Sequence, residues 1–305
     1  MQALPKEFLR EIARYCDFTS KQSEALIAFY SSEASKEKVA QELGISVSAL
    51  NGRLTRAYEN IGSPEDNNKI EELTSLLWNT YRSNDDKSIY YFYVVSKIEI
   101  AQAENIGRLD FSYKRLTEVP ESIGNLTNLI ILDITDNELE KLPKSIVNII
   151  NLTQLNLFNN KLVKLPESIG NITNLTELNL SRNKLTELPE SIGRLANLTK
   201  LNLGSNQIIE FPESIGNITN LTELNLLGNN QIAELPESIG NVTNLTKLNL
   251  SWTQLIKLPE SIGNLAKLAE LNLSWNQLTK VPESIDKLTN LSKLDLSWNQ
   301  LIEPG

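Results

Sequence analysis

The sequence predicts an α/β chain: a horseshoe-shaped solenoid with parallel strands on its concave face, preceded by an all-α helical domain. Three observations predict this fold class. From Ile106 onward a 23-residue unit recurs, and a fixed period of this length is typical of solenoids. Within each unit leucines alternate with polar residues, which is the pattern of a short strand with one buried face. Before Ile106, apolar residues recur at helical spacing behind helix-start residues.

The repeat has the form L-x-x-L-x-L-x-x-N-x-L-x-x-L-P-x-x-I-x-x-L-x-x, as in residues 175–197. The unit that begins at Leu221 carries one extra residue around "GNNQ", and the last unit stops short at Gly305. We therefore predict a repeat domain over residues 105–305 with eight full repeats, a partial ninth and nine strands. The units begin at Ile106, Leu129, Leu152, Leu175, Leu198, Leu221, Leu245, Leu268 and Leu291.

Each part of the repeat has a physical role. Leu178 and Leu180 are expected to face the core, and the Asn after each strand to bond backbone groups of neighbouring turns that water cannot reach. Lys114 and Thr253 replace this Asn in two units, so those two turns should be less well bonded. In "LPESIG" the Pro stops the strand and Ser and Gly allow the turn. The Asn residues are Asn137, Asn160, Asn183, Asn206, Asn276 and Asn299.

This repeat, with its "LPESIGNLTNL" second half, resembles the leucine-rich repeat family, specifically its intracellular, Ras-group-related branch. The resemblance covers about two thirds of the chain. It implies a horseshoe that binds protein or peptide partners in signalling, with a small GTPase as one candidate partner.

Composition excludes several classes of function. With one cysteine, Cys16, and no histidine, the chain lacks disulfide frameworks, the usual zinc ligand sets and histidine-based catalysis. It also lacks a phosphate-binding G-x-x-x-x-G-K-[ST] and a G-x-S-x-G motif. The formal charge of −9 favours solubility over binding to polyanions. We therefore predict a non-enzymatic protein with no metal and no cofactor.

The first residues, "MQALPKEFLREIARYC", carry charges within their apolar pattern and have no hydrophobic core of a signal peptide. No run of about eighteen apolar residues is present to span a bilayer. These features predict a cytoplasmic protein without a membrane partner.

Residues 1–84 are predicted to form a helical domain, with Thr19 and Gln22 as a capping box at one helix start. The segment 36–54, "KEKVAQELGISVSALNGRL", resembles the helix-turn-helix of sigma-factor region 4 and of LuxR-type regulators. That resemblance implies a helix in the DNA major groove. Residues 1–62, however, carry eight basic and eight acidic residues, a weak footprint for phosphate contacts. The residues that would face DNA are Ser46, Ser48, Asn51, Arg53 and Arg56.

Residues 85–104 follow a polar stretch, "RSNDDKS". Their first half can be read as a strand, but we favour a helix from about Ile89 to Glu104 that caps the solenoid, because the end of a repeat array must cover its apolar core.

Three outward-facing rows of side chains follow from the register of the repeats. One row alternates Glu and Lys from Glu177 to Lys293, and the next is a row of amides; both are expected to be mainly structural while offering a polar floor to a partner. The third row ends in Trp252, Trp275 and Trp298. Either these indoles form a contact surface, which we favour, or they stack on one another and stiffen the last repeats. The candidate partner-binding residues are Trp252, Trp275, Trp298, Asn225, Asn249, Asn272, Phe158 and Leu227.

The last unit supplies no polar cap after Leu291, Leu294, Leu296 and Leu301. Either the chain is a fragment of a longer protein, or this end is buried against another molecule, in which case end-to-end homodimers are expected. The leading functional hypothesis is a non-enzymatic scaffold for protein–protein interaction. The alternative is a transcriptional regulator that binds DNA through the helix-turn-helix.

Overall fold

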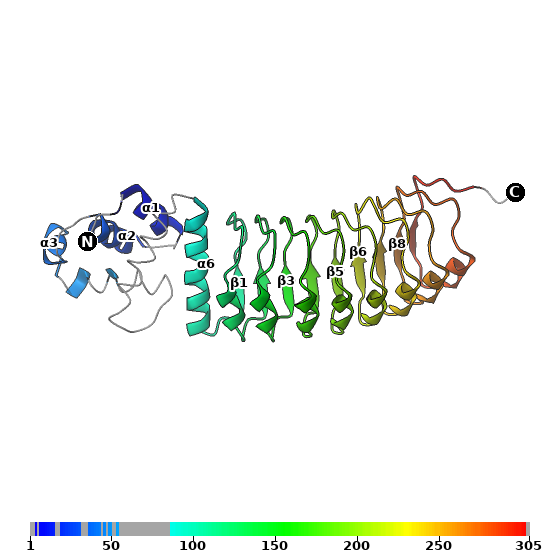
Figure 1. The fold of residues 1–305 in the computed structure, drawn as a ribbon, viewed down its shortest axis with the longest axis horizontal. Helices are drawn as coiled ribbons and strands as arrows, with labels where there is room; N and C mark the ends of the chain where they lie inside the picture. Colours follow the sequence, from blue (N-terminus) through cyan, green and yellow to red (C-terminus); the bar gives the residue numbers. More distant parts are fainter. Residues whose placement is uncertain are drawn as a thin grey trace. The chain divides into compact units, whose positions relative to one another are not determined.

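The computed structural model describes residues 4, 6–15, 19–31, 36–43, 45–46, 48–50, 53–54 and 86–302. The chain divides into two units, Met1–Ile106 and Gly107–Gly305. Each unit is described by itself below, with the element labels of Figure 1.

The first unit is helical where it is described. Its helices are α1 (Lys6–Tyr15), α2 (Ser20–Tyr30), α3 (Lys36–Glu42) and α6 (Asp86–Ala103). Leu9, Ile12, Leu26, Val39 and Leu50 are fully buried in one shared apolar cluster. The predicted capping box opens α2, since Gln22 N–H donates to Thr19 Oγ1 at 3.3 Å and Thr19 N–H donates to Gln22 Oε1 at 2.8 Å.

Two predictions for the first unit are not tested by the described residues. Positions 44, 47, 51–52 and 55–85 lie outside the described residues, so the extent of a helical domain over residues 1–84 and its helix-turn-helix are untested. Residues Asp86–Ala103 are helical, in agreement with the helix expected near Ile89–Glu104 and not with a strand. The role of that helix as a cap of the solenoid is untested.

The second unit is a sheet of nine parallel strands in sequence order, which run side by side in Figure 1. Consecutive strands pair in register, so residues with the same position in the repeat lie next to each other; Leu178, for example, pairs with Leu201. The prediction of nine parallel strands is confirmed for the described residues. The strands are β1 (Arg108–Asp110), β2 (Ile131–Asp133), β3 (Gln154–Asn156), β4 (Glu177–Asn179), β5 (Lys200–Asn202), β6 (Glu223–Asn225), β7 (Lys247–Asn249), β8 (Glu270–Asn272) and β9 (Lys293–Asp295).

A 3-10 helix follows each strand except the last within the described residues, and each begins directly after a Pro, which lacks an N–H and fixes φ. The Gly of "ESIG" is needed for close approach. A Cβ built on Gly193 would lie 2.4 Å from Ser214 O in the next repeat. The helices are η1 (Glu121–Asn125), η2 (Lys144–Asn148), η3 (Glu167–Asn171), η4 (Glu190–Arg194), η5 (Glu213–Asn217), η6 (Glu237–Asn241), η7 (Glu260–Asn264) and η8 (Glu283–Lys287).

The Asn after each strand ties neighbouring repeats together, as the sequence predicted. Asn183 Nδ2 donates to Leu157 O and to Leu180 O, both at 2.9 Å, and its Oδ1 accepts from Leu162 N–H at 3.0 Å. One member of the series was missed by the sequence analysis: Asn229 is fully buried and makes the same bonds to Leu203 O and Leu226 O. The extra residue of that unit therefore follows Asn229.

The turns that carry Thr253 and Lys114 in place of Asn have different hydrogen bonds from those of the other repeats. The Thr253 hydroxyl bonds to Leu250 O at 2.9 Å and to Asn276 Oδ1 at 2.8 Å, so it gives no tie to the preceding repeat. Ile232 N–H, which an Asn at position 253 would engage, instead donates to Asn229 O at 3.2 Å within the turn that holds the extra residue. The turn with the extra residue thus gives Ile232 N–H a hydrogen-bond partner that it would otherwise lack because residue 253 is Thr and not Asn.

The residue after each replaced Asn also changes conformation. Arg115 (φ 52°) and Gln254 (φ 66°) are left-handed. As a result, the Asn of the following repeat accepts two backbone N–H groups in each case. Asn137 Oδ1 accepts from residues 114 and 116, and Asn276 Oδ1 from residues 253 and 255.

Candidate functional site

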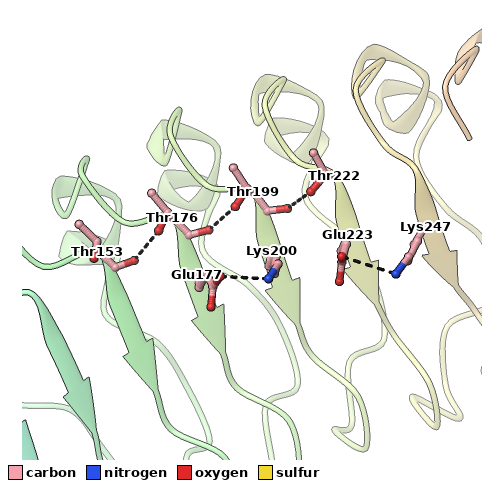
Figure 2. A network of polar contacts seen from close by, with 8 residues as sticks. All are labelled: Thr153, Thr176, Glu177, Thr199, Lys200, Thr222, Glu223 and Lys247. Atoms are coloured by element: carbon pink, nitrogen blue, oxygen red, sulfur yellow. Dashed lines mark hydrogen bonds and ion pairs between the residues drawn. The ribbon is translucent and has the colours of Figure 1, made fainter.

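The first outward-facing row is a ladder of charges on the strands. Salt bridges join Lys200 to Glu177 at 3.0 Å, Lys247 to Glu223 at 3.7 Å and Lys293 to Glu270 at 3.2 Å; Figure 2 shows the first two. The hydrogen bond from Lys200 to Glu177, followed by the attraction of Glu177 and Glu223, raises the pKa of the Lys200 amine. All these side chains are partly exposed, so the pairs mainly neutralise one another.

The threonines that precede the strands form a second ladder, also drawn in Figure 2. Thr176, Thr199 and Thr222 each donate a hydroxyl hydrogen to the backbone oxygen of the equivalent residue one repeat earlier, at 2.9–3.0 Å. These hydroxyls are used within the array, which indicates a structural role.

The amide row closes the end of each strand. Asn225 Oδ1 accepts from Leu227 N–H, Asn249 Oδ1 from the N–H and hydroxyl of Ser251, and Asn272 Oδ1 from the same groups of Ser274. These are turns in which the side chain replaces a backbone acceptor. The three amides remain half-exposed and line a groove of about 640 Å³ over β6–β9. The Asn225 NH2 group donates to Asn202 Oδ1 at 3.0 Å, so part of this row bonds to itself.

The third row lies in the turn just before the buried Asn, and its backbone is left-handed in every repeat. Trp252, Trp275 and Trp298 have φ of 58–59°. Their indoles stack in a continuous pile, with ring centroids 4.3 Å apart at both steps and planes within 14°. We call Trp252, Trp275 and Trp298 the Trp stack. The self-stacking alternative of the sequence analysis is thus realised in the structure.

Stacking does not remove the indoles from solvent. Trp252 is 50% exposed, Trp275 40% and Trp298 67%. A left-handed backbone costs a non-glycine residue about 1–2 kcal/mol, whereas each aromatic pair returns about 0.5–1.5 kcal/mol. Because the backbone is left-handed at this position in every repeat, this cost is common to all non-glycine residues of the row, and the half-exposed indole surface is what distinguishes the three tryptophans.

The turn residues beside the Trp stack carry no charge, whereas Asp295 at the end of β9 accepts from the hydroxyl of Ser297 at 2.6 Å. In repeats five to nine the turn residues before and after this row are Gly, Leu, Ser and Gln. In repeats one to four the row and the turn residues after it include the charged residues Arg115, Asp136, Glu138, Lys161, Arg182 and Lys184. Leu227 is 37% exposed in the uncharged part. Phe158 lies in the charged part, half-buried with the Arg182 guanidinium 5.3 Å from its ring centroid. The candidate residues thus fall into two groups: Leu227 with the Trp stack, and Phe158 apart from them. The uncharged residues are Gly204, Ser205, Gln207, Leu227, Gly228, Gln231, Ser251, Gln254, Ser274, Gln277, Ser297 and Gln300.

Of the residues implied for DNA contact, Ser46, Ser48 and Arg53 are described, and Asn51 and Arg56 lie outside the described residues. Ser46 Oγ accepts from Ala49 N–H at 3.0 Å, so it caps the helical turn that follows. Arg53 is largely buried and pairs with Glu24 of α2 at 3.7 Å. Ser48 is exposed. In the described part of this unit, Ser46 and Arg53 therefore serve the local fold.

Among the residues that the structure describes, no group of three His, Cys, Asp or Glu side chains could hold a metal ion. The described helices include none long and apolar enough to cross a membrane.

Family models decide the identity of the repeat. Two models described as leucine-rich repeat regions match, one over residues 108–181 and 148–253 and the other over residues 243–301. This chain is a leucine-rich repeat protein. No curated protein matches this leucine-rich repeat chain significantly.

Solved structures of leucine-rich repeat proteins are similar to this chain. A leucine-rich repeat protein of Leptospira interrogans is 36% identical over 67% of this chain and 58% of its own, with a TM-score of 0.58. The leucine-rich repeat ectodomain of the Arabidopsis thaliana receptor kinase GASSHO1/SCHENGEN3, in complex with CASPARIAN STRIP INTEGRITY FACTOR 2, is 33% identical over 67% and 26%, with a TM-score of 0.60.

The Arabidopsis receptor kinase HAESA, in complex with the peptide hormone IDA and the co-receptor SERK1, is 32% identical over 65% of this chain and 35% of its own, with a TM-score of 0.58. The leucine-rich repeat chain thus spans less than two thirds of the length of each of these proteins.

Proposed function

We propose that this chain is a non-catalytic scaffold that binds a protein or peptide through the Trp stack and the adjoining amide row. The leucine-rich repeat fold generally mediates protein–protein interaction, and HAESA was solved with a peptide hormone. The observation that carries the proposal is the Trp stack itself, three half-exposed indoles held on left-handed backbone. Large aromatic side chains on a surface are the residues that most often dominate binding energy.

The position of the amides supports the same face. Asn225, Asn249 and Asn272 lie in the strands that directly precede the turns of Leu227, Trp252 and Trp275. A partner across the last four repeats would contact apolar rings at the turns and side-chain amides in the groove. Buried polar contacts of that kind add specificity to apolar anchoring.

We also propose that the partner belongs to a cytoplasmic signalling system, with a small GTPase as one candidate. The support is the resemblance of the "LPESIGNLTNL" half-repeat to the Ras-group branch. Binding of purified small GTPases in their GDP and GTP forms tests this point, and equal lack of binding by both forms would remove it.

A second copy of the chain is a further proposed partner. In the described residues β9 pairs on one side only, with β8. Leu294 and Leu301 are 43% and 41% exposed there. Antiparallel pairing of β9 with its copy, centred on Leu294, would set Lys293 against Asp295 at both ends of the strand pair. Sedimentation should then show dimers that dissociate on dilution, and a monomer at every concentration would contradict the proposal.

The main proposal is tested with peptides selected from a random library on the immobilised chain. We expect Trp275→Ala to weaken a selected peptide by about 2 kcal/mol, or roughly 30-fold, as for a central anchor residue. Tyr113→Ala is the matched control, because Tyr113 has the same left-handed turn position in the first repeat and is 72% exposed. Unchanged affinity for Trp275→Ala, together with a lowered melting temperature, would show that the Trp stack serves stability alone.

A further inference from the structure

The Trp stack ends at a step where the row has no side chain. Trp252 has one indole face against Trp275, and its other face is directed along the array toward the preceding repeat, whose residue at this position is Gly228. Trp252 is 50% exposed, more than Trp275 at 40%, which is stacked on both faces, and less than Trp298 at 67%, which is stacked on one.

Backbone bonds hold Gly228 in the same place in the row as the tryptophans. Gly228 N–H donates to Ser251 O at 2.9 Å, and Trp252 N–H donates in the same way to Ser274 O at 3.1 Å. The φ of Gly228 is +75°, also left-handed. A side chain at this position would therefore continue the row, and glycine leaves its place open.

The residues around that place are uncharged. Ser205 occupies the next position in the row, and Gly204 and Leu227 lie in the adjoining row. Arg182, one repeat further, has its guanidinium over Phe158, 5.3 Å from the ring centroid. Gly228 and Ser205 thus leave room in the row over two repeats, on the order of 10 Å at the usual strand spacing, and Trp252 lies at one side of it; we call this place the recess.

We propose that this recess binds an aromatic side chain of an uncharged peptide segment, stacked on the free face of Trp252 above Gly228. The inference rests on the proposed function and names the partner's chemistry. A ring there would continue the pile at the 4.3 Å spacing seen between the indoles, and offset stacking at that distance is favourable. The absence of charge around the recess selects against a charged ligand residue, which would lose hydration without gaining a partner.

The recess can be filled from within the chain. Because three tryptophans already adopt the same turn, Gly228→Trp should fold and should place a fourth indole on Trp252. Tyr113→Trp is the matched control: it adds an indole at the same left-handed position of the first repeat (φ 58°), outside the Trp stack. Circular dichroism should show the same repeat structure for both variants.

The experiment titrates N-acetyl-tryptophanamide into the chain labelled with 5-fluorotryptophan and follows the fluorine resonances. We expect the Trp252 resonance to shift most, the Tyr113→Trp variant to keep that shift, and Gly228→Trp to lose it. A largest shift at Trp298, or an unchanged response of Gly228→Trp, would overturn the inference.

The library-selected peptide separates this inference from the proposed function. We expect the peptide to contain an aromatic residue and to lose at least tenfold in affinity for Gly228→Trp. If Trp275→Ala weakens binding and Gly228→Trp does not, the Trp stack is a binding surface but the recess is not its anchor site. If neither variant weakens binding, the proposed function itself fails.

Discussion

Asn183→Thr tests the claim that the buried asparagines hold the repeats together. The threonine of this variant is expected to keep a local bond to Leu180 O, as Thr253 does to Leu250 O. It cannot supply the bond to Leu157 O, nor accept from Leu162 N–H, which now lie at 2.9 and 3.0 Å from the amide atoms of Asn183. Leu157 O retains the Asn160 amide at 3.2 Å. The one group left without a partner is therefore the buried N–H of Leu162.

The expected loss follows from these bonds. An unsatisfied buried donor costs about 1–3 kcal/mol, and a lost neutral hydrogen bond costs about 1 kcal/mol. We expect Asn183→Thr to lower the free energy of unfolding by about 2–4 kcal/mol. Urea unfolding followed by circular dichroism measures this change, and hydrogen exchange should show faster exchange at Leu162. A change below about 0.5 kcal/mol with unchanged exchange would refute the reasoning.

The remaining predictions are these. Thr253→Asn should change the free energy of unfolding by less than about 1 kcal/mol in the same urea assay, because Ile232 N–H already has a partner; a gain as large as the loss in Asn183→Thr would contradict this. Gly193→Ala should cost about 2–3 kcal/mol by urea unfolding, since its Cβ would overlap Ser214 O, whereas Gly107→Ala, with its nearest atom at 3.5 Å, should be near neutral. The Ser112 hydroxyl donates to Asp110 at 2.6 Å and lowers the pKa of that carboxyl. The ionised Asp110 carboxylate therefore contributes to stability above pH 3.8, the pKa of this group in the unfolded chain. The contribution is lost as the pH falls through the lower pKa of the folded state. Ser112→Ala should raise the pKa of Asp110 in an NMR titration, and an unmoved pKa would rule out this cause.

The sequence by itself determined the array. Because side chains alternate along a strand, the L-x-L pattern decides which leucines are buried, and the constant period places like residues beside one another in nine parallel strands. It also revealed the Trp row and the Glu and Lys ladder, since both follow from the register alone. The left-handed turn of that row had a readable signal, because Asp136, Asn159 and Gly228 share the position and these residue types favour left-handed backbone.

Tertiary structure decided how the local exceptions are resolved. Whether Asn229 or Asn230 enters the core depends on where the extra residue fits, and the turn after Asn229 then gives Ile232 a local partner in place of residue 253. The orientation of the indoles, and with it the free face of Trp252, depends on contacts between repeats 23 residues apart. The pairing of Arg53 with Glu24 joins distant segments in the same way. These features depend on packing between residues that are far apart in the sequence. Local sequence patterns do not predict them, because burial and hydrogen-bond partners are set by neighbours in space.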